Sequence, residues 1–174
     1  EQITAVANER NLGFAAGINV GIRHAIGAGA QSVLVLNNDT VAAPDMLAEL
    51  LQAMSAGPHV GAVGPVIYYH AAPDRIWRLG DRAVPCLPVP LRLGRREVER
   101  AGGKSLPVDF LTACALLVRR EVFDQVGLFD ESYPMYYEDA DFCRRVRRAG
   151  WQILAVPRAR LWHKVALSAS KQKR

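Results

Sequence analysis

The chain has 174 residues, of which 50% are hydrophobic and 22% charged, and these fractions exclude a disordered chain, a collagen-like repeat and a coiled coil. A chain of this length can form one domain with a substantial core and needs no disulfide or metal support. The 22 Lys and Arg residues exceed the 17 Asp and Glu residues, and this mild positive charge favours an anionic ligand or surface without choosing among polyanions, membranes and phosphorylated ligands.

The first 70 residues alternate between helix and strand patterns. Apolar residues recur every four positions over residues 14–27, which predicts a helix. The continuous apolar run 33–36 predicts a strand buried on both faces, residues 43–58 a second helix, and residues 60–68 another buried strand. This order predicts a right-handed βαβ unit and therefore an α/β fold, with a mostly parallel, Rossmann-like sheet flanked by helices.

The second half of the chain begins without a regular period. Residues 71–107 are interrupted by prolines, and we expect a long loop or weak hairpin, a kind of segment that often carries function. Residues 110–120 and 151–157 predict two further buried strands. Residues 120–127 and 138–150 predict helices, the second with a solvated face rich in arginine.

The order of the elements also bears on the extent of the domain. The first predicted element is a helix, whereas a sheet of this kind normally has a strand before that helix. We therefore expect a single domain over residues 1–165 that lacks an N-terminal strand-helix-strand unit of about 30 residues or more. Residues 166–174 are polar and basic, and we expect them to form a flexible tail.

Polar side chains follow two of the predicted strands, where α/β sheets bind ligands. Asn37, Asn38 and Asp39 come directly after the first strand, and an Asn-x-Asp pair offers hard oxygen ligands for Mg²⁺ or Mn²⁺ bridging phosphates. An Asx-type turn is the more common explanation of such a sequence on its own. His163 follows the last strand and is either a metal or phosphate ligand or an ordinary surface histidine.

A second acidic cluster lies at the predicted start of the helix 138–150. Glu138, Asp139 and Asp141 can simply complement the helix dipole. They follow an aromatic, proline-containing loop, however, and a carboxyl group buried there would have a raised pKa suited to a general base. Asp141 is spaced to pair with Arg144 or Arg145 on the same helix.

A glycine-rich segment leads into the first helix. Asn11, Gly13 and Asn19 belong to the sequence NLGFAAGIN, in which glycines let the backbone approach a ligand and the helix N-terminus favours anionic groups. The spacing matches neither the dinucleotide-binding fingerprint nor a Walker A loop.

Taken together in this order, the motifs NLGFAAGIN, LNNDT, RREVFDQVGLFDESY, YEDADFCRRVRRAGW and VPRARLWH resemble the family 2 glycosyltransferases of the GT-A fold, particularly the rhamnosyltransferase-like members. The resemblance covers residues 11–163. It implies inverting transfer of a sugar from a nucleotide-diphosphate donor to a hydroxyl group of a glycan or lipid-linked acceptor, with Mg²⁺ or Mn²⁺ as cofactor, in polysaccharide, cell-wall or glycolipid assembly.

The resemblance also implies roles for individual residues. Asp39 takes the place of a metal ligand of the family's D-x-D motif, with Asn37 where an Asp is often found and Asn38 between them, and His163 takes the place of a further metal or diphosphate contact. The loss of one carboxylate at Asn37 lowers the charge available to a cation.

The same resemblance makes Asp139 the catalytic base, with Glu138 as a group that supports it or orients the acceptor. It places three residues beside the donor pocket, namely Asn11, Gly13 and Asn19.

Two other functions remain open from the sequence. A non-catalytic nucleotide- or carbohydrate-binding remnant of the same fold would explain the asparagine at position 37 and the expected missing unit. Nucleic-acid binding through the arginine pairs is less favoured, because these pairs alternate with core positions, and we expect no nucleic-acid partner.

The compartment is predicted from what the sequence lacks. The three cysteines form no C-x-x-C pair, and we find no signal peptide and no apolar stretch long enough to cross a membrane. We therefore expect a soluble cytoplasmic protein whose basic surface contacts the inner face of an anionic membrane.

Overall fold

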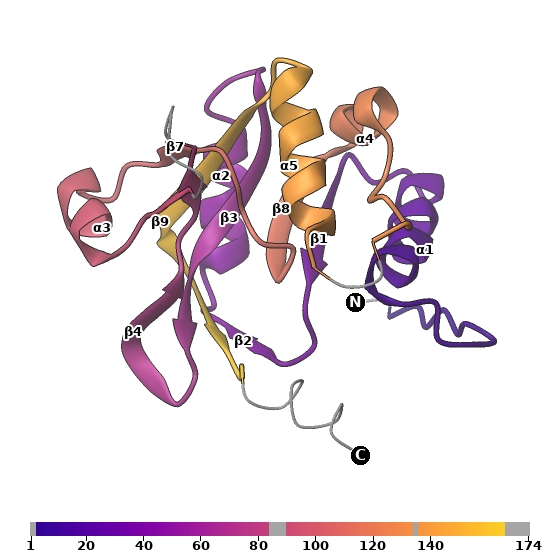
Figure 1. Cartoon of the computed structure of the whole chain (residues 1–174), viewed down its shortest axis with the longest axis horizontal. Helices are drawn as coiled ribbons and strands as arrows, with labels where there is room; N and C mark the ends of the chain where they lie inside the picture. The colour runs from indigo at the N-terminus through magenta and orange to yellow at the C-terminus, as the bar shows by residue number, and fades with distance from the viewer. Residues whose placement is uncertain (1–2, 84–89, 134–135, 166–174) are drawn as a thin grey trace.

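The computed structural model describes residues 3–83, 90–133 and 136–165, and its main sheet is mixed and has helices on both faces (Figure 1). The predicted tail 166–174 lies outside the described residues. In chain order the elements are α1 (Phe14–Gly27), β1 (Ser32–Leu36), β2 (Thr40–Ala42), α2 (Met46–Met54), β3 (Val60–Tyr69), β4 (Ala72–Arg78), β5 (Asp81–Arg82), β6 (Leu91–Arg92), α3 (Arg95–Ala101), β7 (Leu106–Val108), β8 (Ala115–Arg119), α4 (Arg120–Val126), α5 (Glu138–Arg148) and β9 (Gln152–His163). Within these ranges, we find no helix with the length and apolar character of a membrane span.

The strands of the main sheet are mostly antiparallel. Their order is β1-β8-β3-β9-β2, with β4 paired to β3 and β7 paired to β9. The β3–β9 pair is parallel, and the pairs β1–β8, β3–β8, β2–β9, β3–β4 and β7–β9 are antiparallel. The α/β class is as predicted, but the prediction of a mostly parallel sheet is wrong.

The reason for this error lies in the position of β8. Because β1 and β3 are both antiparallel to β8, they point in the same direction, as expected for two strands joined through α2. The later strand β8 occupies the place between them. The run 33–36 is also not buried on both faces as expected, because β1 lies at the end of the strand order and Leu36 is 43% exposed. A continuous apolar run carries no information about the direction of the neighbouring strands.

The two faces of the sheet pack against different helices. Side chains alternate along β3, so that Ala62 and Val66 join the core with α1, α4 and α5, whereas Val63 and Ile67 join the core with α2. The helices therefore form layers on either side of the sheet, with α5 in front of it and α2 behind it in the view of Figure 1.

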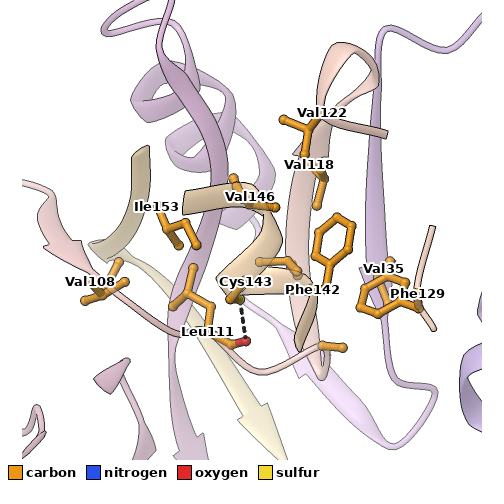
Figure 2. Packing of buried hydrophobic residues seen from close by; sticks show 14 of the residues in the cluster. Val35, Val108, Leu111, Val118, Val122, Phe129, Phe142, Cys143, Val146 and Ile153 are labelled. Carbon is orange, nitrogen blue, oxygen red and sulfur yellow. Dashed lines mark hydrogen bonds between the residues drawn. The ribbon is translucent and has the colours of Figure 1, made fainter. Parts of the chain in front are cut away.

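Helix α5 is packed firmly against the sheet and α4. Its Phe142 and Val146 are fully buried and point toward the strands (Figure 2). The Phe142 ring lies 4.5 Å from that of Phe129 and 5.6 Å from that of Phe123, measured between centroids. The Cys143 thiol lies 3.5 Å from the backbone oxygen of Leu111. This packing fixes the start of α5 beside the segment that precedes β8.

Residues 71–107 hold more secondary structure than a loop or weak hairpin. β4 forms a hairpin with β3, β5 pairs with β6, and α3 and β7 follow. β5, β6 and β7 have two or three residues each, and β4 and α3 are largely exposed. Short and exposed elements leave no hydrophobic period in the sequence, and the strands and helix of this region were therefore not predicted.

Candidate active site

The start of α5 presents Asp139 in an unusual backbone setting. Tyr136 and Tyr137, directly before the helix, have φ angles of 67° and 73°. Positive φ angles are uncommon for bulky residues and are concentrated at functional sites. One Asp139 oxygen accepts a hydrogen bond from the backbone N–H of Ala140 at 2.9 Å, and the other accepts one from Ala113 at 3.3 Å.

Burial changes the acidity of both carboxyl groups at this helix start. It raises the pKa of Asp139, although hydrogen bonds from Ala113, Thr112 and Ala140 oppose the shift. Burial also raises the pKa of Glu138, and the neighbouring charge of Asp139 adds to this effect. The sequence predicted a raised pKa for a carboxyl group buried at this helix start, and this direction of the shift is confirmed. A raised pKa gives the carboxylate a greater affinity for protons.

The three acidic residues of the cluster occupy different environments. Asp139 lines a cleft, whereas Glu138 is only 5% exposed and does not line it. The Glu138 Oε2 atom has no hydrogen-bond partner among the described residues. Asp141 pairs with Arg145 at 2.7 Å, as its spacing predicts. Arg145 also donates to the backbone oxygens of Val126 and Leu128, so it belongs to the packing of α4 on α5 and not to a solvated face.

The cleft beside Asp139 has a volume of about 490 Å³. Its walls come from α5 and the segment before it, from the residues preceding β8, and from the end of β4 and the start of β5. The side chains that matter most for chemistry are Trp77, Arg78, Asp81, Thr112 and Tyr137, together with Asp139. Aromatic and polar groups thus surround two carboxylates, the half-buried Asp139 and the buried Asp81, an arrangement typical of a binding site for a polar ligand.

A second polar group lies where β2 pairs with the end of β9. The pairing sets Thr40 opposite His163, and this brings the Asp39 carboxylate within 3.0 Å of the His163 Nε2 atom. His163 is 7% exposed, and its Nδ1 atom has no partner among the described residues. The Thr40 hydroxyl donates to the backbone oxygen of Asn37 at 2.6 Å, so residues 37–40 form a turn that presents Asp39, but this bond is not the side-chain bond of an Asx-type turn.

The segment 112–114 connects these two polar groups. The Ala113 N–H donates to Asp139, while the Cys114 backbone oxygen accepts a hydrogen bond from the Asn37 N–H. Burial raises the pKa of the Cys114 thiol to about 12, and the nearby Asp39 carboxylate contributes to the shift. The carboxylates of Asp39 and Asp139 therefore flank the same three residues.

Trp77 provides a second connection between them. Its ring centroid lies 4.5 Å from that of His163, and its side chain also lines the cleft of Asp139. The structure thus connects three of the predicted site residues, namely Asp39 before β2, Asp139 in the first turn of α5 and His163 at the end of β9.

Asp39 and His163 are suitable ligands for a divalent cation, but they supply only two of the ligands that such an ion needs. A carboxylate and an imidazole are ligands for Mn²⁺, and a carboxylate suits Mg²⁺. The described residues contain no group of three or more His, Cys, Asp and Glu side chains that could hold a metal ion. Two protein ligands are sufficient where phosphate oxygens and water complete the coordination, as is common for Mg²⁺ with phosphate substrates. Asn37 is half-buried and Asn38 is exposed in the same turn.

The predicted N-terminal site residues lie in a different part of the molecule, at α1. The Asn11 side chain accepts a hydrogen bond from the Gly13 N–H at 2.9 Å, and Gly13 has a φ angle of 82°. Asn19 is buried and bonds both the N–H and the C=O of Phe129, as well as the Glu131 carboxylate. The carboxamide of Asn19 therefore holds the segment after α4 in place, and its contact with a donor stays a prediction.

The sequence analysis missed Asp81 and Trp77, which both come from the region 71–107. Asp81 is 5% exposed, pairs with Arg78 at 3.2 Å, and has an Oδ1 atom without a partner in the described part of the chain. Burial raises the pKa of Asp81 against the lowering effect of the Arg78 and Arg92 charges, and the charge of Asp139 adds a smaller increase. A tryptophan three residues after Asp74 and an aspartate after Gly80 form no motif, so no sequence signal marks either residue.

With this geometry established, comparison with known proteins assigns the chain to a class. Residues 1–173 match the family described as "Glycosyltransferase like family 2", and the chain belongs to this family of glycosyltransferases. The structure is similar to a crystal structure of GalNAc-T7 with UDP, GalNAc and Mn²⁺, with a TM-score of 0.68 and 19% sequence identity over 90% of this chain and 31% of that one. The fold is therefore of the GT-A type.

Two curated relatives have names that state the kind of sugar transfer. N-acetylglucosaminyl-diphospho-decaprenol L-rhamnosyltransferase of Mycobacterium tuberculosis is 36% identical in an alignment of 155 residues that covers 80% of this chain and 48% of the relative. The low-salt glycan biosynthesis hexosyltransferase Agl10 of Haloferax volcanii is 28% identical in an alignment of 147 residues that covers 79% of this chain and 44% of the relative. The chain thus spans about half the length of the curated relatives that it matches.

Proposed function

We propose that this domain transfers a sugar from a nucleotide-diphosphate donor to a hydroxyl group of a lipid-linked glycan acceptor, with inversion at the anomeric carbon. The observation that supports this function best is the placement of Asp39 and Asp139 on either side of the segment 112–114, with Trp77 contacting His163 and lining the cleft of Asp139. A leaving-group site and a base are thereby held next to each other.

Asp139 acts as the general base in this proposal. It accepts the proton of the acceptor hydroxyl as the new bond from the acceptor oxygen to the anomeric carbon forms and the bond from that carbon to the diphosphate oxygen breaks. Its raised pKa favours proton uptake, and the backbone N–H groups of Ala113 and Ala140 hold the carboxylate in position. Glu138 supports the start of α5 from its buried position. The scheme needs no covalent nucleophile.

Asp39 and His163 hold the diphosphate end of the donor. A divalent cation, Mg²⁺ or Mn²⁺, bound there would neutralise the negative charge of the departing diphosphate. The exposed Asn38 and the half-buried Asn37 border the same turn and contact the donor. Asn11, Gly13 and Asn19 remain candidates for the far edge of the donor pocket.

The sugar and the acceptor are suggested by the relatives' names. The mycobacterial relative is named as a rhamnosyltransferase acting on a diphospho-decaprenol acceptor, and the haloarchaeal relative as a hexosyltransferase. We propose rhamnose as the donor sugar, because the rhamnosyltransferase shares the higher identity. An acceptor anchored in a lipid bilayer would bring the basic domain to the cytoplasmic membrane surface.

A donor panel tests this function. Nucleotide-diphosphate rhamnose and hexose donors would be offered with a diphosphoprenyl-linked sugar, with Mg²⁺ or Mn²⁺ and then with EDTA, and the anomeric configuration of the product would be read by NMR. We expect rhamnosyl transfer with inversion that stops with EDTA, and in Asp39→Ala a loss of about 10²-fold or more. Asp45→Ala, at the start of α2, is the control and should retain activity. Donor binding without turnover in the parent would instead identify a non-catalytic remnant.

A further inference from the structure

A basic hollow adjoins the active-site cleft on the side of β4 and α3. It has a volume of about 670 Å³ and lies between β4 and the segment that runs from β6 into α3. These elements project from the side of the sheet away from α1 (Figure 1). The charged residues that line the hollow are three arginines and one aspartate, namely Arg75, Arg92, Arg95 and Asp74. The excess of arginine favours an anionic ligand.

The arginines are held by contacts that leave their donors available. The Arg75 guanidinium lies over the Tyr69 ring, 5.0 Å from its centroid. The pair between Arg95 and Glu99 uses the Nε atom of Arg95, and a guanidinium carries five N–H donors in all. Arg92 lies opposite Asp81 in the β5–β6 pair. Guanidinium groups bind phosphate oxygens through paired hydrogen bonds, so two or more of them in one hollow suit a phosphate or diphosphate.

The hollow continues in two directions that matter for its ligand. Trp77 forms part of its wall and also lines the cleft of Asp139, so a ligand in the hollow would lie next to the acceptor hydroxyl group. On the other side, Asp74 and Arg95 also line a second hollow of about 480 Å³, where Arg160 and Trp162 are added. A chain extending from the diphosphate therefore has an open route away from the active site.

We propose that this basic hollow binds the diphosphate group of the acceptor. The proposal rests on the function proposed above, in which the donor diphosphate is held at Asp39 and His163. Two diphosphates near one cleft require two sites of different chemistry. The first has a carboxylate and an imidazole suited to a cation, whereas the basic hollow supplies the positive charge itself through Arg75, Arg92 and Arg95.

A binding measurement tests the hollow without any reaction. Inorganic pyrophosphate would be titrated into the protein by calorimetry in the absence of divalent cations. We expect the parent to bind it and the double variant Arg75→Gln/Arg92→Gln to bind it about tenfold more weakly or worse, because two charge-assisted contacts are lost. The matched control is Arg96→Gln, an exposed arginine of α3 that does not line the hollow, and it should bind as the parent does. Circular dichroism would verify the fold of each variant.

A kinetic measurement tests the assignment to the acceptor. The same sugar would be offered as a short-chain prenyl diphosphate conjugate and as a phosphate-free alkyl glycoside. In the double variant we expect KM to rise about tenfold or more for the first acceptor and to stay unchanged for the second, with hydrolysis of the donor alone unaffected. The variant Arg75→Lys/Arg92→Lys should recover part of the loss, since lysine keeps the charge but not the paired geometry.

The outcomes separate this inference from the proposed function. If the parent fails to bind pyrophosphate at millimolar concentration, or the double variant binds it as well as the parent, the inference is wrong whether or not transfer occurs. A KM change shared equally by both acceptors would also overturn it. If the double variant loses only its sedimentation with phosphatidylglycerol vesicles, the arginines serve a lipid surface and the acceptor assignment fails. Absence of transfer by a parent that binds pyrophosphate would count against the proposed function alone.

Discussion

Replacing Asp139 by asparagine separates the chemical role of this residue from its structural role. Asparagine has nearly the same shape but cannot accept the proton of the acceptor hydroxyl. A positioned general base contributes about 10²- to 10⁴-fold to a rate, or roughly 3 to 5 kcal/mol of the activation barrier. We therefore expect Asp139→Asn to lower kcat for transfer by about 10²- to 10⁴-fold.

The effect of the same change on stability should be small. The carboxylate accepts hydrogen bonds from Ala140 at 2.9 Å and from Ala113 at 3.3 Å, and the asparagine oxygen can keep the shorter one. Losing the longer bond costs about 1 kcal/mol. Removing a buried charge, whose burial raises the pKa of Asp139, offsets this cost at neutral pH. We expect the melting temperature to change by no more than about 4 °C.

The assay would measure initial rates at saturating donor and acceptor, together with thermal unfolding of the same samples. The control is Asp141→Asn, two residues further along α5, whose carboxylate pairs with Arg145 instead of lining the cleft. It should retain the parent's kcat. A folded Asp139→Asn protein with more than a tenth of the parent's kcat would refute the assignment of Asp139 as the base.

The pH dependence gives an independent check. A general base must be ionised, so kcat/KM of the parent should fall as the pH falls through the pKa of Asp139. Because burial raises this pKa, the loss should occur at a higher pH than for an exposed aspartate. The acidic limb should be absent from the residual activity of Asp139→Asn. Its persistence there would mean that another group controls it.

Three further predictions concern stability. Phe142→Ala, at a fully buried position between two phenylalanine rings, should lower the free energy of unfolding by about 3 to 5 kcal/mol in urea titrations. Gly61→Ala should lower the free energy of unfolding by about 1 to 3 kcal/mol, because a Cβ there would lie 2.8 Å from side-chain atoms of Trp151 and Val122. The control is Gly21→Ala in α1, whose Cβ would meet no atom within 4 Å, and this change should be stabilising. Burial raises the pKa of Asp81 in the folded chain, so the stabilising contribution of the protonated Asp81 side chain is lost as the pH rises through that pKa. The melting temperature of Asp81→Asn relative to the parent should therefore increase from pH 4 to pH 7. An unchanged or falling difference between the two melting temperatures would contradict this prediction.

The helices α1, α2, α4 and α5 and the strands with long apolar runs could be predicted from the sequence, whereas α3 could not, because it lies in the region without a regular period. The helix expected over residues 14–27 and the one expected over 138–150 correspond to α1 and α5. The direction of the strands could not be predicted in the same way. β8 enters the sheet between β1 and β3, and this depends on long-range pairing that no local pattern records.

The candidate site was predictable where polar residues interrupt a strong pattern. Asp39 ends an apolar run, and Asp139 begins an amphipathic helix. Trp77 and Asp81 have no such background, because the strands β4 and β5 are short or exposed and give no regular hydrophobic pattern. Their importance comes from position alone, since they reach the cleft only after β4 has folded back along β3.

Three carboxyl groups in or beside the cleft are costly to ionise. Burial raises the pKa of Asp81, Glu138 and Asp139, and two of these groups have an oxygen without a partner among the described residues. Such groups persist only where the surrounding structure holds them in place. Here that support comes from α5, whose Phe142 and Val146 are fully buried against the sheet. Because the same helix carries Asp139 and anchors the core, the carboxylate that we propose as the base is held in place without a disulfide between the buried Cys114 and Cys143, which are both free.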